Sequence, residues 1–229
     1  MLAILWLSEF ASAMETVSFS TEDGGTIYGD LYAPSTAGQT SNSTPERGIV
    51  LAHGGRFNKE SWAKQAPELT KAGFRVLAID FRGKGKSTGP GDKDMMSAAL
   101  HLDVLAAVRY LHQTGTKYVS AMGGSMGGWA CAEAAARCEP GEIERLVLLG
   151  STSSDTQPEK VQGRKLFILC REDANADGLR LPRIQADFDK TPEPKELILL
   201  DGTAHAQFIF ESDQNDRAMR EIMRFLTKE

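Results

Sequence analysis

The motif GGSMG at residues 123–127 constrains this chain more than any other sequence feature. It has the form G-x-S-x-G and lies between an apolar run that ends near Ala121 and an alanine-rich run that starts at Trp129. This context predicts a strand, a sharp turn and a helix, whereas the motif alone also fits an ordinary glycine-rich turn. Glycines two positions on either side let the strand and helix approach closely, which lifts the serine hydroxyl clear of the sheet. Ser125 is therefore the candidate nucleophile.

A serine hydroxyl needs a base within hydrogen-bond reach, and the chain contains 4 histidines. His53 ends an apolar run, and His101 and His112 lie in a long helical pattern. His205 comes in a short loop after the apolar residues 197–200. A loop that follows the last strand of a parallel sheet brings its side chains over the carboxyl edge of that sheet. His205 is the predicted base, the alternative being a surface histidine.

The third member of such a site is a carboxylate that orients the imidazole and stabilises its protonated form. Asp173 comes directly after the predicted strand at residues 165–170 and is our candidate. The competing carboxylates are Glu172, Asp177, Asp155 and Asp201. We expect the side chain of Glu172 to point the other way and Asp201 to close a turn. The order Ser125, Asp173, His205 is the nucleophile, acid, base order of one fold.

Two further segments support a resemblance to the α/β-hydrolase superfamily. Residues 47–55, RGIVLAHGG, look like the strand and His-Gly loop of that family. Residues 80–87, DFRGKGKS, look like its D-x-R-G-x-G-x-S turn, with a lysine where histidine is common. Gly124 stands where the family often has histidine or glutamine before the serine. The resemblance covers nearly everything from about Val17 to the C-terminus.

This resemblance implies a site and a reaction. The backbone amides of Gly55 and Met126 would form the oxyanion hole, with Arg56 as the alternative to Gly55, and His53 would be structural. The implied activity is that of a serine hydrolase that cleaves carboxylic esters through an acyl-enzyme. Thioester, peptide or lactone cleavage uses the same groups. Met126 also occurs in perhydrolases of this fold, and a non-catalytic ligand-binding protein is the alternative from another class.

The remaining patterns predict an α/β fold with a mostly parallel sheet and helices on both faces. Residues 16–20 and 26–31 alternate apolar and polar positions, which predicts an antiparallel hairpin at the N-terminal edge of the sheet. Further strands are expected at residues 49–52, 75–79, 118–122, 146–149, 166–169 and 197–200. Helices are expected at residues 61–72, 95–113, 129–138, 181–188 and 216–227. We expect residues 15–229 to form a single domain.

The polar segment 151–163 has no apolar periodicity from which to build a helical cap. The chain is thus similar to lidless members such as dienelactone-hydrolase-like proteins and small carboxylesterases. An open site favours small or extended acyl substrates. The side chains that could line it, or form only its rim, are those of Arg56, Phe57, Met95, Met96 and Phe208.

Several other classes are disfavoured. A net charge of −5 without a basic stripe argues against nucleic acid as a partner. The string GKS at residues 85–87 lacks the glycine that a P-loop needs five positions earlier, where Asp80 stands. Three cysteines, Cys131, Cys138 and Cys170, cannot form a disulfide framework. Histidine and cysteine spacings match no metal motif, so we expect neither a metal nor another cofactor.

The N-terminus allows two interpretations. Residues 1–7 are apolar and residues 11–13 read Ala-Ser-Ala, a form typical of signal-peptidase sites, so residues 1–13 would direct export. The apolar run is short, however, and no basic residue precedes it, so Met14 is an alternative start. We favour a cytoplasmic location on this basis. No later segment is long and apolar enough to predict stable membrane insertion.

Overall fold

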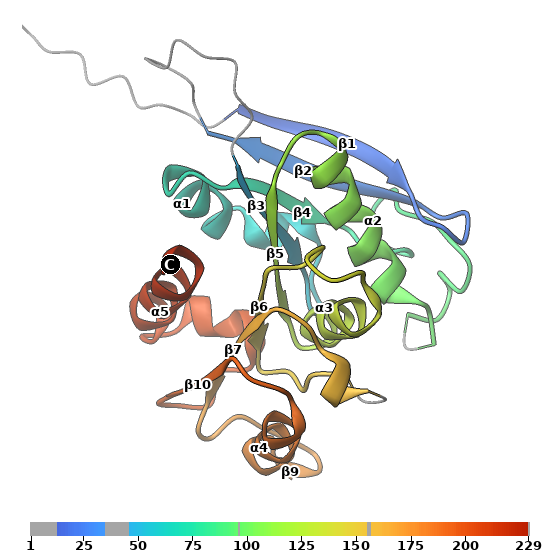
Figure 1. Ribbon diagram of the computed structural model, residues 1–229. Helices are drawn as coiled ribbons and strands as arrows, with labels where there is room; N and C mark the ends of the chain where they lie inside the picture. The colour runs from blue at the N-terminus through green and yellow to red at the C-terminus, as the bar shows by residue number, and fades with distance from the viewer. Residues whose placement is uncertain (1–12, 35–45, 96, 155–156, 229) are drawn as a thin grey trace, which may run out of the picture.

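The computed structural model describes residues 13–34, 46–95, 97–154 and 157–228 (Figure 1). Its central feature is an 8-stranded sheet with the order β1-β2-β4-β3-β5-β6-β7-β10. These strands are β1 (Ala13–Ser20), β2 (Thr26–Ala33), β3 (Arg47–Ala52), β4 (Arg75–Ile79), β5 (Tyr118–Gly124), β6 (Arg145–Leu149), β7 (Arg164–Cys170) and β10 (Lys195–Leu200). The predicted signal-like segment, residues 1–13, lies outside the described residues apart from Ala13.

Strand direction confirms the predicted fold class. β1 and β2 form an antiparallel pair at one edge, and β2 also runs antiparallel to β4. In the rest of this sheet, β4, β3, β5, β6, β7 and β10 run parallel to one another. In the centre of the sheet, Ala52 of β3 pairs with Gly123 of β5. The loops that follow these two strands therefore leave the same edge side by side.

Helices cover both faces of the sheet (Figure 1). They are α1 (Gln65–Lys71), α2 (Leu100–Gln113), α3 (Met126–Arg137), α4 (Leu181–Lys190) and α5 (Asn215–Thr227). One apolar core contains side chains of α2, α3 and α4, and the other contains side chains of α1 and α5. β3 contributes to both, because Val50 and Ala52 belong to the first core and Ile49 and Leu51 to the second. This alternation is the period-two pattern of a strand that is buried on both faces.

Several elements differ from the predicted ones; α3, for example, begins at Met126 rather than at residue 129. The helix expected at residues 61–72 divides into the 3-10 turn η1 (Lys59–Trp62) and the shorter α1. α2 begins at Leu100 rather than at residue 95, because Asp94 accepts hydrogen bonds from Ser97 Oγ and from the following amides and so holds a turn there. A small hairpin of β8 (Ala174–Asn175) and β9 (Gly178–Leu179) was not predicted.

No cap interrupts the sheet in the part of the chain that the structure describes. Between β6 and β7, residues 150–154 and 157–163 contain one helical element, the 3-10 turn η2 (Pro158–Lys160). The lidless form predicted from this polar segment is therefore confirmed. None of the helices in the described ranges combines the length and apolar character required to span a bilayer.

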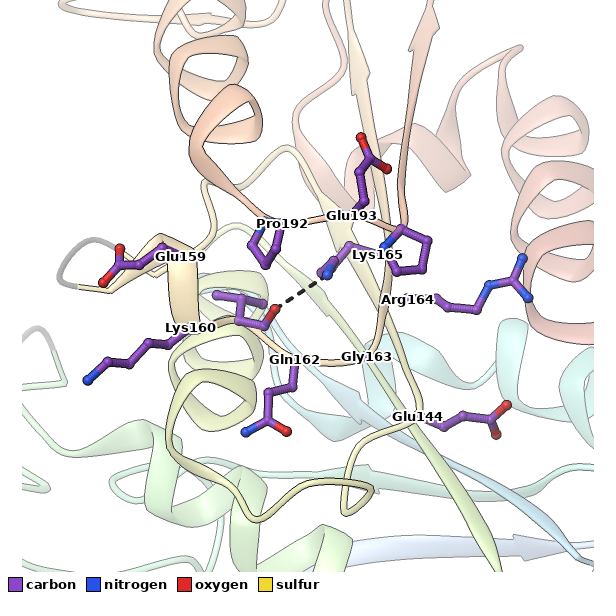
Figure 2. Close-up of a pocket in the computed structure, with 11 residues that line it drawn as sticks. Glu144, Glu159, Lys160, Gln162, Gly163, Arg164, Lys165, Pro192 and Glu193 are labelled. Atoms are coloured by element: carbon purple, nitrogen blue, oxygen red, sulfur yellow. Dashed lines mark hydrogen bonds between the residues drawn. The ribbon is translucent and has the colours of Figure 1, made fainter.

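A cavity of about 450 Å³ opens at the amino edge of the strands, opposite the edge where β5 ends (Figure 2). It lies among residues that precede or begin β6, β7 and β10, including Glu144, Lys160 and Glu193. Lys165, the second residue of β7, lies at this cavity with a side chain that is only 1% exposed. Its Nζ donates to the carbonyl oxygen of Val161 at 3.3 Å. Burial lowers the pKa of this amine to about 8.

Candidate active site

Ser125 occupies the single position between β5 and α3, and its backbone is strained. Its φ of 51° and ψ of −116° fall in a region that residues with a side chain rarely adopt. Two hydrogen bonds hold this conformation: Ser125 N donates to Leu149 O at 2.9 Å, and Trp129 N donates to Ser125 O at 3.0 Å. The turn thus has the geometry expected of a nucleophile elbow.

The two outer glycines of the motif are required by close backbone contacts. A Cβ on Gly123 would lie 2.3 Å from the carbonyl group of Gly127. A Cβ on Gly127 would lie 2.3 Å from the carbonyl oxygen of Ala52 and 2.6 Å from that of His53. Because these neighbours are backbone atoms, a side chain at either position would push α3 away from the sheet.

We therefore expect Gly127→Ala to lower the free energy of unfolding by about 1–3 kcal/mol, the usual effect of forcing a methyl group into a packed region. The displaced helix should also carry the amide of Met126 away from its place beside Ser125. Chemical denaturation measures the first effect, and the reaction rate of Ser125 with an active-site probe measures the second. An unchanged denaturation midpoint together with an unchanged rate would contradict this account of the motif.

His205 follows β10 and lies directly before the 3-10 helix η3 (Ala206–Glu211). Its Nε2 is 2.9 Å from Ser125 Oγ. The loop after β6 passes close beside the ring, since a Cβ on Gly150 would lie 3.1 Å from His205 Nδ1. Two other histidines have different partners. The two ring nitrogens of His112, for example, lie within hydrogen-bond distance of the carbonyl oxygens of Thr116 and Glu142.

Asp173, in the turn after β7, completes the arrangement. Its side chain is fully buried, and its Oδ2 is 2.7 Å from His205 Nδ1. Among the competing carboxylates, Glu172 and Asp177 are exposed, and Asp201 faces Arg171 and Arg217 at 3.7 Å and 3.8 Å. Asp155 lies outside the described residues. The structure therefore brings Ser125, His205 and Asp173 into one chain of contacts.

Arg180 also contacts Asp173, which sequence reasoning did not anticipate. The β8–β9 hairpin folds back, so that Arg180 N donates to Asp173 O at 2.9 Å. The Arg180 Nε lies 3.2 Å from Asp173 Oδ1, and the two atoms form an ion pair without a hydrogen bond between them. The two oxygens of the buried carboxylate thus face an imidazole and a guanidinium. Only the unpredicted hairpin brings Arg180 back, so the sequence contained no recognisable sign of it.

The loop after β3 holds Gly54 and Gly55 against the elbow. A Cβ on Gly54 would lie 3.2 Å from Gly124 O, and one on Gly55 would lie 3.7 Å from Met126 Sδ. Met126 is the first residue of α3, and the first amides of a helix have no partner within it. The two predicted oxyanion donors, the amides of Gly55 and Met126, therefore belong to neighbouring segments beside Ser125.

Hydrogen bonds at Gly54 orient the peptide that contains the amide of Gly55. The Gly54 carbonyl oxygen accepts from His53 Nδ1 at 2.8 Å and from Phe57 N at 2.9 Å. Because a trans peptide is planar, fixing this carbonyl directs the Gly55 N–H the opposite way. The Gly54 N–H is itself engaged with Gln207 Oε1 at 2.6 Å. This register favours Gly55 over the alternative, Arg56.

His53 has the structural position implied for it. The ring is fully buried, with Nδ1 on the Gly54 carbonyl and Nε2 accepting from Phe81 N at 3.3 Å. These two partners require the neutral form with the proton on Nδ1. Burial lowers the pKa of His53 to about 4, so the ring stays neutral at pH 7.

An aromatic pair borders the site. Phe57, after the oxyanion loop, and Phe208, after His205, have ring centroids 5.0 Å apart. Phe208 is 37% exposed, so part of the pair faces solvent. Of the other predicted lining residues, Arg56 is exposed, Met95 packs partly against the core, and Met96 lies outside the described residues.

Parts of this chain are similar in sequence to known proteins. A non-heme chloroperoxidase from Streptomyces lividans is 33% identical over 119 residues, which cover 48% of this chain and 41% of that protein. A bifunctional esterase/perhydrolase from Acinetobacter calcoaceticus is 30% identical over 131 residues, which cover 57% of this chain and 41% of that protein. The matched segments thus span less than half the length of these relatives.

Solved structures and a family model extend the comparison to the fold. An esterase from Pyrococcus furiosus superposes with a TM-score of 0.76 at 18% identity, covering 95% of this chain and 91% of that one. At this identity the likeness concerns the fold alone. The model of the alpha/beta hydrolase fold matches residues 49–169, a segment that runs from β3 through the elbow to the end of β7. Since this match covers more than half of the 229 residues, the chain belongs to the α/β-hydrolase fold family.

Proposed function

We propose that this protein is a serine hydrolase that cleaves small carboxylic esters through an acyl-enzyme. The observation that carries the proposal is the unbroken series of contacts from Ser125 Oγ to His205 Nε2 at 2.9 Å, and from His205 Nδ1 to Asp173 Oδ2 at 2.7 Å. A histidine that spans a hydroxyl and a buried carboxylate is arranged to move a proton away from the hydroxyl. The strained elbow and the neighbouring amides support the same role.

In the proposed reaction, Ser125 Oγ attacks the ester carbonyl carbon while its proton passes to His205 Nε2. The amides of Gly55 and Met126 stabilise the negative oxygen of the tetrahedral intermediate. When the intermediate collapses, the carbon–oxygen bond breaks and His205 gives the proton to the departing alcohol. Water then attacks the acyl-enzyme, passing its proton to His205 and releasing the acid and free Ser125.

The open form of the site bears on the class of substrate. The lidless edge of the sheet supports small or extended acyl substrates in solution. Thioesters, lactones and peptides would follow the same steps. One relative is named an esterase/perhydrolase, which favours perhydrolysis as a second activity. In that reaction hydrogen peroxide replaces water in the attack on the acyl-enzyme and gives a peracid.

Labelling with a fluorophosphonate probe tests the proposal. An activated serine displaces fluoride from the probe and keeps the phosphonyl group on its oxygen, whereas an ordinary surface serine does not react. We expect the wild-type protein to be labelled and Ser125→Ala to remain unlabelled, with equal folding by circular dichroism. Equal labelling of both proteins would refute the assignment of Ser125. A folded wild type that stays unlabelled would favour a ligand-binding protein of this fold instead.

A further inference from the structure

Gln207 links the loop that holds His205 to the loop that precedes Gly55. It lies two residues after His205, on η3, and its side chain is 4% exposed. Its Oε1 accepts from Gly54 N at 2.6 Å, across 153 positions of sequence. Its Nε2 donates to Ser61 Oγ at 2.7 Å. One buried amide therefore joins two segments of the candidate site that are far apart in the chain.

The same side chain also packs against the elbow. A Cβ on Gly124 would lie 3.0 Å from Gln207 Cγ, and one on Gly54 would lie 3.4 Å from Gln207 Oε1. Gln207 is thus wedged where the loops after β3, β5 and β10 meet. Gln207 holds the N–H of Gly54. The carbonyl group of the same residue, Gly54, sets the direction of the Gly55 N–H.

We propose that Gln207 is a positioning residue that holds the oxyanion loop in register with Ser125 and His205. The inference rests on the hydrolase function proposed above and adds a residue to it. Without the Gln207 acceptor, the buried Gly54 N–H loses its partner, and an unpaired buried amide is costly enough to favour movement of the loop. Such movement would turn the Gly55 N–H away from the developing oxyanion and leave ground-state binding largely intact.

The test uses Gln207→Met, which keeps the length and packing of the side chain but removes the acceptor. We expect kcat for p-nitrophenyl acetate to fall about 10- to 30-fold, less than the loss of an oxyanion donor itself, while KM stays within about twofold. The affinity for a trifluoromethyl ketone, which forms a tetrahedral oxyanion on the serine, should fall by a similar factor. Active-site titration gives kcat per functional serine and so corrects for misfolded protein.

Two further variants separate positioning from general stability. Ser61→Ala removes the outer partner of Gln207 but leaves the bond to Gly54, so its kcat should stay within about threefold of the wild type. Gln207→Glu keeps an acceptor for the Gly54 N–H and should retain more of kcat than Gln207→Met. If Gln207→Met lowers only the melting temperature, or lowers kcat no more than Ser61→Ala does, Gln207 is a structural residue and the proposal is wrong.

The same measurements on the wild type separate a failure of the positioning role from a failure of the proposed function. If the wild type neither turns over the ester nor binds the ketone, the hydrolase proposal fails and the role of Gln207 fails with it. If the wild type is active and Gln207→Met matches it in kcat and in ketone affinity, the hydrolase proposal stands and the positioning role alone is overturned.

Discussion

Replacing Asp173 with asparagine should lower kcat for an ester substrate about 10⁴-fold, the loss that follows when a triad histidine is held in the wrong tautomer. The surroundings of Asp173 determine which way the asparagine amide would point. Arg180 Nε lies 3.2 Å from Oδ1 and would attract the amide oxygen of the asparagine. The amide nitrogen would then face His205 Nδ1, which must give up its proton to accept that hydrogen bond. With its proton on Nε2, His205 cannot take one from Ser125.

The measurement is steady-state hydrolysis, normalised by folded protein. Glu172→Gln is the matched control, because this neighbouring carboxylate is exposed and should leave kcat within about twofold. A decrease of less than tenfold in Asp173→Asn would mean that another group orients His205.

The second large effect concerns the stability of the protein and a residue at the amino edge of the sheet, opposite the edge that carries Ser125. Lys165→Met should raise the free energy of unfolding at pH 7 by about 3 kcal/mol, since one pKa unit corresponds to about 1.4 kcal/mol and burial lowers the Lys165 pKa from 10.5 to about 8. The folded state binds the proton of the Lys165 amine less tightly than the unfolded state does. The destabilisation caused by the charged Lys165 amine is therefore complete below pH 8 and disappears as the pH rises from 8 to 10.5.

Chemical denaturation of the wild type and Lys165→Met at pH 7, 9 and 10.5 checks both the size and the sign of the change in the free energy of unfolding. The advantage of Lys165→Met over the wild type should shrink steadily across this series. Lys160→Met is the control, because Lys160 lines the same cavity but is exposed and should change stability little at any of these pH values. A variant that is less stable than the wild type at pH 7 would show that the Lys165 amine is stabilising.

Most of the fold was predictable because its evidence is local. Alternating apolar and polar positions at residues 16–20 and 26–31 predicted the antiparallel edge, and the regular succession of apolar runs and helical patterns predicted the parallel sheet. The polar composition of the segment after β6 predicted the absence of a cap. Helix boundaries were less accurate, because turns such as that at Asp94 depend on side-chain hydrogen bonds that compete with the helix.

The candidate triad was predictable for a related reason. In a parallel sheet, the residues after each strand meet at one edge, so Ser125, Asp173 and His205 were expected together from chain order alone. What the pattern could not supply was the environment of each group. Arg180 reaches Asp173 through a short hairpin that carries no periodic signal, and Gln207 contacts Gly54 although the two lie 153 positions apart in the sequence.

The sequence by itself thus determined the class of fold, the strained serine turn and the chain order of the candidate triad. Each of these depends on neighbouring residues or on the common direction of the parallel strands. Only the tertiary structure decided which side chains surround the candidate site, such as Arg180 beside Asp173 and Gln207 on the Gly54 amide. The reason is that hydrogen bonds such as Gly54 to Gln207 join segments 153 residues apart, and no local pattern encodes such a pairing.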